Sequence, residues 1–140
     1  MEPVIDHIQI TVRDINKAEL FYDKFLPLLG FDIRNKVSAV IEAHDFHVVE
    51  YSHARLSFAI TTPRKAFVND VVHRRKPGAL HHLAFRASSR KEVDRFHFEL
   101  LDIGAPIVAE PRIYPEYGPG YYALYFKDPD GIKFEIVCNQ

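Results

Sequence analysis

Two histidines begin segments of this chain that read alike. His7 opens the run HIQITVRD, and His82 opens the run HLAFRASS 75 positions later. A repeat with a histidine at the same place in both copies indicates a duplicated strand that carries a functional group. A glutamate, Glu135, lies in an apolar segment near the end of the chain. Two imidazoles and one carboxylate form a ligand set for a divalent metal ion with open coordination positions, so these residues point to metal chemistry.

The alternation of side chains along strands predicts that His7, His82 and Glu135 all point to the sheet faces that the helices do not cover. Successive side chains of a strand point to opposite faces, so His7 lies with Gln9 while Ile8 and Ile10 face the other way. The same parity separates Glu135 from the apolar residues on either side of it. We therefore expect His7, His82 and Glu135 on the faces turned away from the helices.

His81 adjoins His82, and a shift of one residue would exchange the two imidazoles. Both strand parity and the repeat select His82 as the ligand. His81 then falls on the helix-facing side, where we expect a packed or hydrogen-bonded neighbour.

The two halves show the same order of elements, one strand and one helix followed by three strands. The strands of the first half are predicted at Val4–Val12, Phe31–Lys36, within Ala43–Tyr51, and at Ala54–Thr61, and its helix follows Asp14 as N-cap and ends at Pro27 and Gly30. The strands of the second half are predicted at Leu80–Ala87, Ile107–Glu110, Tyr121–Lys127 and Ile132–Cys138.

Local signals in the second half mark its helix and its last hairpin. Ser89 and Glu92 form a predicted capping box at the start of the helix, and Gly104 suits the left-handed residue after its end. The apolar stripe comprises Val93, Phe96, His97, Leu100 and Leu101, and the turn between the last two strands is DPDG. The sequence thus predicts an α+β fold of two βαβββ modules, about 1–62 and 79–140, with a connector at about 63–78. Together they form a single domain over 1–140.

Composition and charge exclude several classes of function. The chain has 140 residues, 47% of them hydrophobic, and a net charge of −1 with both signs mixed, so we expect no nucleic-acid partner. The basic run Arg74–Lys76 is predicted to be a solvated loop. There is no signal peptide and no apolar stretch long enough for a membrane span, so a cytoplasmic protein is expected. The single cysteine, Cys138, is expected to be a buried small hydrophobe.

Longer motifs resemble a known family. The runs DHIQITVRD, GALHHLAFRA and GYYALYFKDPDGIKFEIV are similar to those of the vicinal oxygen chelate superfamily, which includes glyoxalases, bleomycin-resistance proteins and extradiol dioxygenases. The resemblance covers nearly the whole chain. It implies a cupped, barrel-like mixed sheet with the helices outside, and a homodimer. It also implies that His7, His82 and Glu135 are metal ligands for Fe, Mn, Zn or Ni.

Two positions depart from the pattern of glyoxalase I. That enzyme uses a fourth ligand, a carboxylate at the end of the first half, where the repeat places Ala59 in this chain; it also tends to carry an arginine where this chain has Thr11. Glu50 is the candidate substitute for the missing ligand, against the alternative of an exposed glutamate beside a hairpin. A metal site with three protein ligands is therefore expected, which leaves more of the ion open to substrate.

Four further residues are predicted to line a substrate pocket. Gln9 and Arg86 share the faces of the two histidines, while Tyr117 and Tyr121 belong to a segment rich in proline and glycine at the expected pocket mouth. No catalytic residue is assigned. The sequence favours a small metal-dependent enzyme, a lyase, transferase or dioxygenase, that chelates adjacent oxygens of a small organic substrate. The alternative is a non-catalytic protein of the bleomycin-resistance type that binds an antibiotic or aromatic compound.

Overall fold

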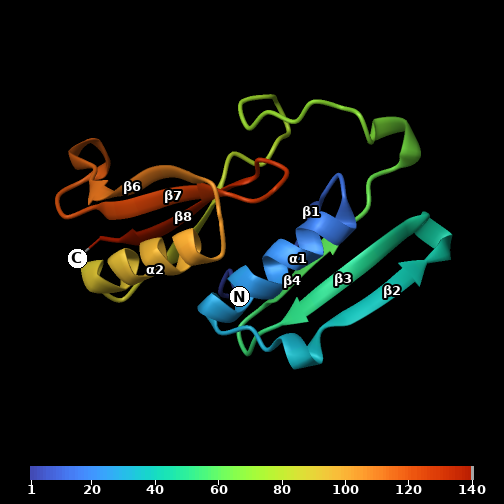
Figure 1. The fold of residues 1–140 in the computed structure, drawn as a ribbon, viewed down its shortest axis with the longest axis horizontal. Helices are drawn as coiled ribbons and strands as arrows, with labels where there is room; N and C mark the ends of the chain where they lie inside the picture. Colours follow the sequence, from blue (N-terminus) through green and yellow to red (C-terminus); the bar gives the residue numbers. More distant parts are fainter. Residues whose placement is uncertain (140) are drawn as a thin grey trace. The chain divides into compact units, whose positions relative to one another are not determined.

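The computed structural model of the protein describes residues 1–139 and divides into two compact units (Figure 1). The first unit ends at Asp70 and the second begins at Val71. Each unit consists of one four-stranded sheet with one helix packed against it. The two units are described separately below.

The first unit has the strand order β1-β4-β3-β2, with β1 parallel to β4 and the other pairs antiparallel. Its elements are β1 (His7–Thr11), α1 (Ile15–Phe25), η1 (Leu26–Leu29), η2 (Ile33–Asn35), β2 (Val37–Ile41), η3 (Glu42–His44), β3 (Phe46–Ser52), β4 (Ser57–Thr61) and η4 (Lys65–Phe67), where η denotes a short 3-10 turn.

The second unit repeats this topology in the order β5-β8-β7-β6, again with one parallel pair, β5 and β8. Its elements are β5 (Leu83–Arg86), α2 (Arg90–Asp102), β6 (Ile107–Ile113), η5 (Pro115–Tyr117), β7 (Tyr122–Lys127) and β8 (Lys133–Cys138). The predicted α+β class and the two βαβββ modules are confirmed.

Helix α1 packs on its sheet through the predicted apolar stripe. Asp14 accepts hydrogen bonds from two amides of the first turn, as an N-cap does. Ala18, Phe21, Tyr22 and Phe25 are all buried. The Tyr22 ring lies 5.2 Å from that of Phe58 on β4, which joins the helix to the middle of the sheet.

Ser89 is the N-cap of α2, and its hydroxyl accepts a hydrogen bond from the Glu92 amide at 3.2 Å. The Glu92 carboxylate in turn accepts from the amide and the hydroxyl of Ser88, at 2.6 and 2.7 Å. Each side chain of the predicted capping box thus satisfies a free backbone N–H at the helix start, and the donor to Glu92 is Ser88. Gly104 has φ 76°, as predicted for the residue that closes the helix. Leu101 is exposed, so its place in the apolar stripe is wrong.

The strand predicted at Phe31–Lys36 is wrong. Gly30 adopts a left-handed conformation with φ 91°, which turns the chain after α1. The Asp32 carboxylate then accepts a hydrogen bond from the Arg34 amide at 3.0 Å and begins the turn η2. This side-chain bond offers the backbone an alternative to a strand, so β2 starts only at Val37.

The hairpin between β7 and β8 is built on one buried aspartate. Asp128 is 2% exposed, and its Oδ1 accepts hydrogen bonds from the amides of Asp130 and Ile132 at 2.9 and 2.8 Å. Gly131 completes the turn with φ 83°. The predicted turn is therefore confirmed, and it sets where β8 begins.

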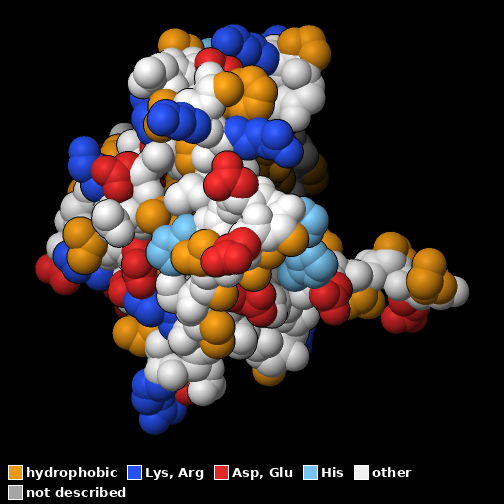
Figure 2. All heavy atoms as spheres, turned by 90° about the vertical axis from the view of Figure 1, so that its right-hand side faces the viewer, with side chains coloured by type: hydrophobic (Ala, Val, Ile, Leu, Met, Phe, Trp, Pro, Cys, Tyr) orange, Lys and Arg blue, Asp and Glu red, His pale blue; other side chains and the backbone are white. Residues whose placement is uncertain are grey.

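The surface carries charges of both signs. Figure 2 shows basic, acidic and histidine side chains together on one face of the molecule, in keeping with a net charge of −1. Within residues 1–139, neither helix has the length and hydropathy needed to cross a membrane.

We expect the substitution Asp128→Ala to lower the free energy of unfolding by about 2 to 3 kcal/mol, because two turn amides lose their acceptor. Denaturant unfolding followed by circular dichroism measures this. Asp102→Ala, at an exposed position at the end of α2, is the control and should change stability by less than about 0.5 kcal/mol. Equal stability of the two variants would contradict the role of Asp128.

Candidate metal centre

Strand register places Glu135 and Ala59 at equivalent positions in the two sheets. Glu135 on β8 pairs with Ala84 on β5, and Ala59 on β4 pairs with Gln9 on β1. Ala84 and Gln9 each lie two residues beyond a histidine of the repeat. The sequence alignment of the halves is therefore confirmed, and a carboxylate stands at this position in the second sheet only.

Glu135 is buried, with 1% of its surface exposed, on the face of its sheet opposite to α2. Its Oε1 accepts hydrogen bonds from the hydroxyls of Tyr121 and Tyr125, at 2.5 and 3.0 Å. Its Oε2 lies 3.1 Å from Nε2 of His82. One carboxylate oxygen is thus held by two tyrosines, while the other faces the histidine.

The two tyrosines remain hydrogen-bond donors at neutral pH. Burial, with the hydrogen bond to Glu135 as the second cause, raises the pKa of Tyr121 to about 12. Burial and the charge of Glu135 raise the pKa of Tyr125 above its ordinary value. Both hydroxyls therefore keep their protons and fix the orientation of the carboxylate.

The spacing of the two candidate ligand atoms fits a shared metal ion. Two ligand atoms about 2.1 Å from an ion, at right angles to each other, are separated by about 3.0 Å. Nε2 of His82 and Oε2 of Glu135 lie 3.1 Å apart. A neutral imidazole nitrogen and a carboxylate oxygen also suit the divalent ions of the first transition row.

Each candidate histidine is held by the residue that precedes it. Nδ1 of His82 lies 2.7 Å from Nδ1 of His81, and Nδ1 of His7 lies 2.7 Å from Oδ1 of Asp6. Burial and the neighbouring positive charges lower the pKa of His81. Its neutral ring can therefore accept a hydrogen bond from Nδ1 of His82 at neutral pH. In both halves Nδ1 is occupied and Nε2 is the nitrogen left for a metal, which is how ligand histidines are commonly oriented.

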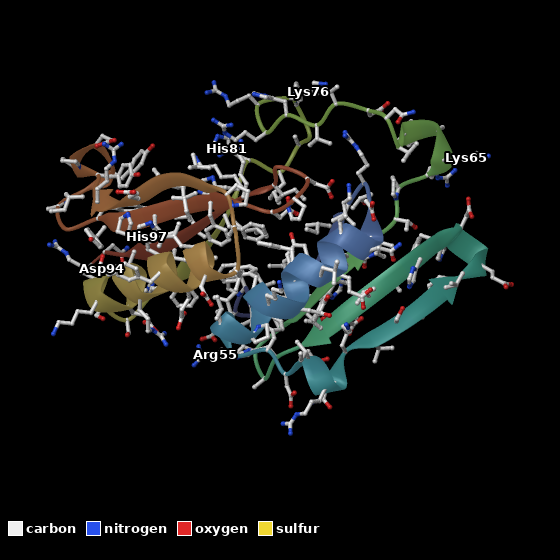
Figure 3. All side chains as sticks on the ribbon, viewed as in Figure 1. Arg55, Lys65, Lys76, His81, Asp94 and His97 are labelled. Carbon is white, nitrogen blue, oxygen red and sulfur yellow. The ribbon has the colours of Figure 1, made fainter. Side chains whose placement is uncertain are left out.

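Asp6 and Tyr125 are site residues that the sequence reasoning missed. A polar residue directly before the histidine occurs in both halves, as Asp6 and as His81, and this was the available signal. His81 was expected on the helix-facing side. It is exposed at the end of the connector (Figure 3), and it hydrogen-bonds to His82. Its role as a hydrogen-bonded neighbour is confirmed, and its place among the helix-facing residues is wrong.

The structure brings together His82 and Glu135, which lie in one unit, while His7 belongs to the other. The His7 side chain is 64% exposed, and its Nε2 faces no hydrogen-bonding partner within residues 1–139. Across those same residues, no group of three His, Cys, Asp or Glu side chains is arranged to hold a metal ion. The pair in the second unit is therefore the part of the predicted ligand set with observed geometry.

Basic side chains accompany this pair. Arg86 is exposed on β5 beside Val137, two register pairs along from Glu135, and its side chain has no partner within residues 1–139. Lys133 lies with its Nζ 4.2 Å from the centre of the Tyr125 ring. Burial and the charge of Arg74 lower the pKa of Lys133. These groups can attract an anionic oxygen of a ligand.

The other predicted pocket residues fall into two groups. Tyr117 is 62% exposed on η5, and its ring meets that of Tyr121 edge to face at 5.4 Å. Tyr121 contacts Glu135 directly and so orients the carboxylate. Gln9 lines a separate cavity in the first unit.

Glu50, the candidate substitute for the missing carboxylate, lies on β3 directly opposite Ala59. It therefore shares the face of the sheet that carries His7, and it is exposed. Ala59 itself is 4% exposed.

Comparison with known proteins shows similarity along almost the whole chain. The family model of the Glyoxalase/Bleomycin resistance protein/Dioxygenase superfamily matches residues 4–136. The uncharacterized protein YqjT of Bacillus subtilis (strain 168) is 31% identical over 132 residues, which are 94% of this chain and 96% of that protein.

Solved structures share the fold. A glyoxalase-like protein from Bacillus halodurans is 29% identical with a TM-score of 0.74, and the match covers 95% of this chain and 93% of that one. A glyoxalase/bleomycin resistance protein/dioxygenase domain from Frankia sp. EAN1pec is 21% identical with a TM-score of 0.77, over 100% and 99% of the two chains.

We expect Tyr121→Phe to weaken binding of Zn²⁺ or Mn²⁺ about tenfold, because Glu135 loses a hydrogen bond that orients it. Isothermal titration calorimetry on the metal-free protein measures the affinity. Tyr117→Phe removes a hydroxyl that does not contact Glu135 and is the matched control. Equal affinities of the two variants would show that the hydrogen bond does not position the carboxylate.

Proposed function

The chain belongs to the glyoxalase/bleomycin resistance protein/dioxygenase superfamily, and we propose that it is a small metal-dependent enzyme. In this proposal His7, His82 and Glu135 hold one divalent ion, which binds adjacent oxygens of a small organic substrate. Two copies of the chain form the active homodimer.

One observation carries the proposal. Oε2 of Glu135 and Nε2 of His82 lie 3.1 Å apart, while Oε1 and Nδ1 of the same side chains are occupied by Tyr121 and His81. A carboxylate and an imidazole that served only packing would not need their second donor and acceptor positions fixed in this way. The arrangement matches ligands whose supporting hydrogen bonds are already in place.

The first unit supports the proposal through His7. Asp6 occupies Nδ1 of His7, and its Nε2 stays available on an exposed ring. Asp6 takes the place in the first half that His81 takes in the second. The duplicated histidine is thus accompanied by a duplicated support, although the supporting residue differs in charge.

The chain's own residues have separate tasks around such an ion. A divalent ion bound there supplies Lewis acidity to the substrate oxygens. Tyr121 and Tyr125 keep the Glu135 carboxylate oriented, and Arg86 offers a guanidinium that can bind a carboxylate or enolate oxygen of the substrate. With Ala59 in place of a fourth ligand, the ion keeps an additional position for substrate.

We expect protein purified without a histidine tag to contain, or to bind stoichiometrically, a divalent Fe, Mn, Zn or Ni ion, as measured by inductively coupled plasma mass spectrometry. Glu135→Ala should weaken binding of that ion at least about 100-fold, because a ligand is lost. Glu116→Ala, at an exposed position on η5, is the control and should bind normally. Absence of a bindable ion, or undiminished binding by Glu135→Ala, would refute the proposal.

The same metal titration tests whether Glu50 is a ligand of the ion. We expect Glu50→Ala to bind the ion with unchanged affinity, because Glu50 is exposed and lies on β3, the strand beside that of Ala59. A tenfold loss would instead make Glu50 a fourth ligand.

Metal dependence also distinguishes a metal-dependent enzyme from a non-catalytic binding protein. Loss of activity on chelation by EDTA, restored by the ion, is the expected result. Tight binding of an aromatic compound that survives EDTA, without turnover, would identify a non-catalytic protein of the bleomycin-resistance type. Oxygen-dependent cleavage of a catechol with iron, or thiol adducts with nickel or zinc, would identify the reaction.

A further inference from the structure

The first unit contains a cavity that the proposed metal centre does not use. It has a volume of about 500 Å³ and is lined by the ends of β1 and β4, by the turn between β2 and β3, and by the chain from Thr62 to Phe67. All of its lining residues belong to the first unit. Small-molecule sites commonly measure about 300 to 1,000 Å³, so the cavity has the size of a ligand site.

The cavity begins close to His7 along the same strand. Gln9 and Thr11 line it, and both project from the face of β1 that carries His7. At about 3.3 Å per residue they lie about 7 and 13 Å from His7 along the strand. A molecule with oxygens at His7 can therefore extend a ring-sized group into the cavity.

Aromatic side chains form part of the lining. Phe67 on η4 is 56% exposed, although a large apolar side chain is normally withdrawn from water. Phe46 begins β3, and its ring stacks on that of His44 with 5.9 Å between the centres and an angle of 14°. Flat apolar faces of this kind favour a planar aromatic ligand over a flexible polar one.

Arg64 supplies the positive charge of the cavity. It lies directly before η4, the turn marked by Lys65 in Figure 3. Its guanidinium makes no hydrogen bond or ion pair within residues 1–139, so its donors remain available to a ligand. A guanidinium binds a carboxylate through two parallel hydrogen bonds.

Asp45 sets a limit on the charge of the ligand. It lines the cavity and has φ 53°, the only positive φ of a non-glycine residue in the described part of the chain. Its carboxylate forms no ion pair with Arg64 or any other described residue. A ligand with several negative charges would be repelled by it, whereas a single carboxylate can bind at Arg64.

We propose that this cavity recognises the part of the substrate remote from the metal, and that this part is an aromatic ring bearing one carboxylate. The ring packs on Phe46 and Phe67, and the carboxylate binds Arg64. The assignment rests on the proposed function for the role of His7, but recognition of the aromatic carboxylate does not require the ion.

The test uses 2-naphthoate as the probe and the full chain freed of metal by EDTA. The protein has no tryptophan, so the probe fluorescence can be followed with little interference. We expect saturable binding that Arg64→Gln weakens about tenfold or more, the usual effect of losing a charge-assisted hydrogen bond. Phe67→Ala should weaken it several-fold, and Asp45→Asn should leave it unchanged or strengthen it.

Matched controls lie outside the cavity. Arg55→Gln removes another exposed arginine of the first unit, and Leu20→Ala removes an exposed apolar side chain of α1. Both should bind 2-naphthoate as the unsubstituted protein does. Circular dichroism shows that each variant is folded. No saturable binding to the unsubstituted protein, equal losses in Arg64→Gln and Arg55→Gln, or equally tight binding of neutral 2-naphthol would overturn the proposal.

A further variant separates this proposal from the metal centre. His7→Ala in the absence of metal should bind 2-naphthoate normally, because His7 does not line the cavity. A protein that binds the probe through Arg64 but binds no metal would refute the proposed function and leave the cavity assignment standing. A protein that binds metal but not the probe would have the opposite meaning.

Discussion

The burial of Glu135 is the constraint on which the second unit depends. Removing a carboxylate from water costs several kcal/mol unless partners replace the lost hydration. Three side chains supply these partners: Tyr121 just before β7, Tyr125 within β7, and His82 just before β5. The Glu135 carboxylate reaches all three partners when β8 lies between β5 and β7 in this register. The hydrogen bonds of the site and the pairing of the sheet therefore depend on each other.

Duplication has produced two sheets with the same topology and different interiors. The position of Glu135 is taken by Ala59 in the first unit, where no buried charge needs partners. The support of the histidine has also diverged, from a carboxylate in Asp6 to an imidazole in His81. The two repeats therefore orient their imidazoles through partners of different charge, a carboxylate in one and an imidazole in the other.

The sequence was sufficient for the topology and for the faces of the strands, because both depend on periodic patterns that burial enforces. Glu135 lies on the predicted face, and His82 rather than its neighbour approaches it. The prediction of a strand at Phe31–Lys36 was wrong because a single hydrogen bond to the Asp32 side chain competes with strand pairing. A bond of this kind produces no periodic pattern in the sequence. The role of Asp6 was missed for a similar reason, since one hydrogen bond to the next residue has no pattern of its own.

The absence of a carboxylate at Ala59 has a consequence beyond the number of metal ligands. A glutamate there would place a negative charge next to Gln9, on the face from which the cavity of the first unit extends. It would add to the repulsion of an anionic ligand by Asp45. An alanine adds no charge to this face, where Glu50 is already exposed on the neighbouring strand. The residue that leaves a coordination position open thus also makes the face beside Gln9 less repulsive to a ligand carboxylate than a glutamate at position 59 would.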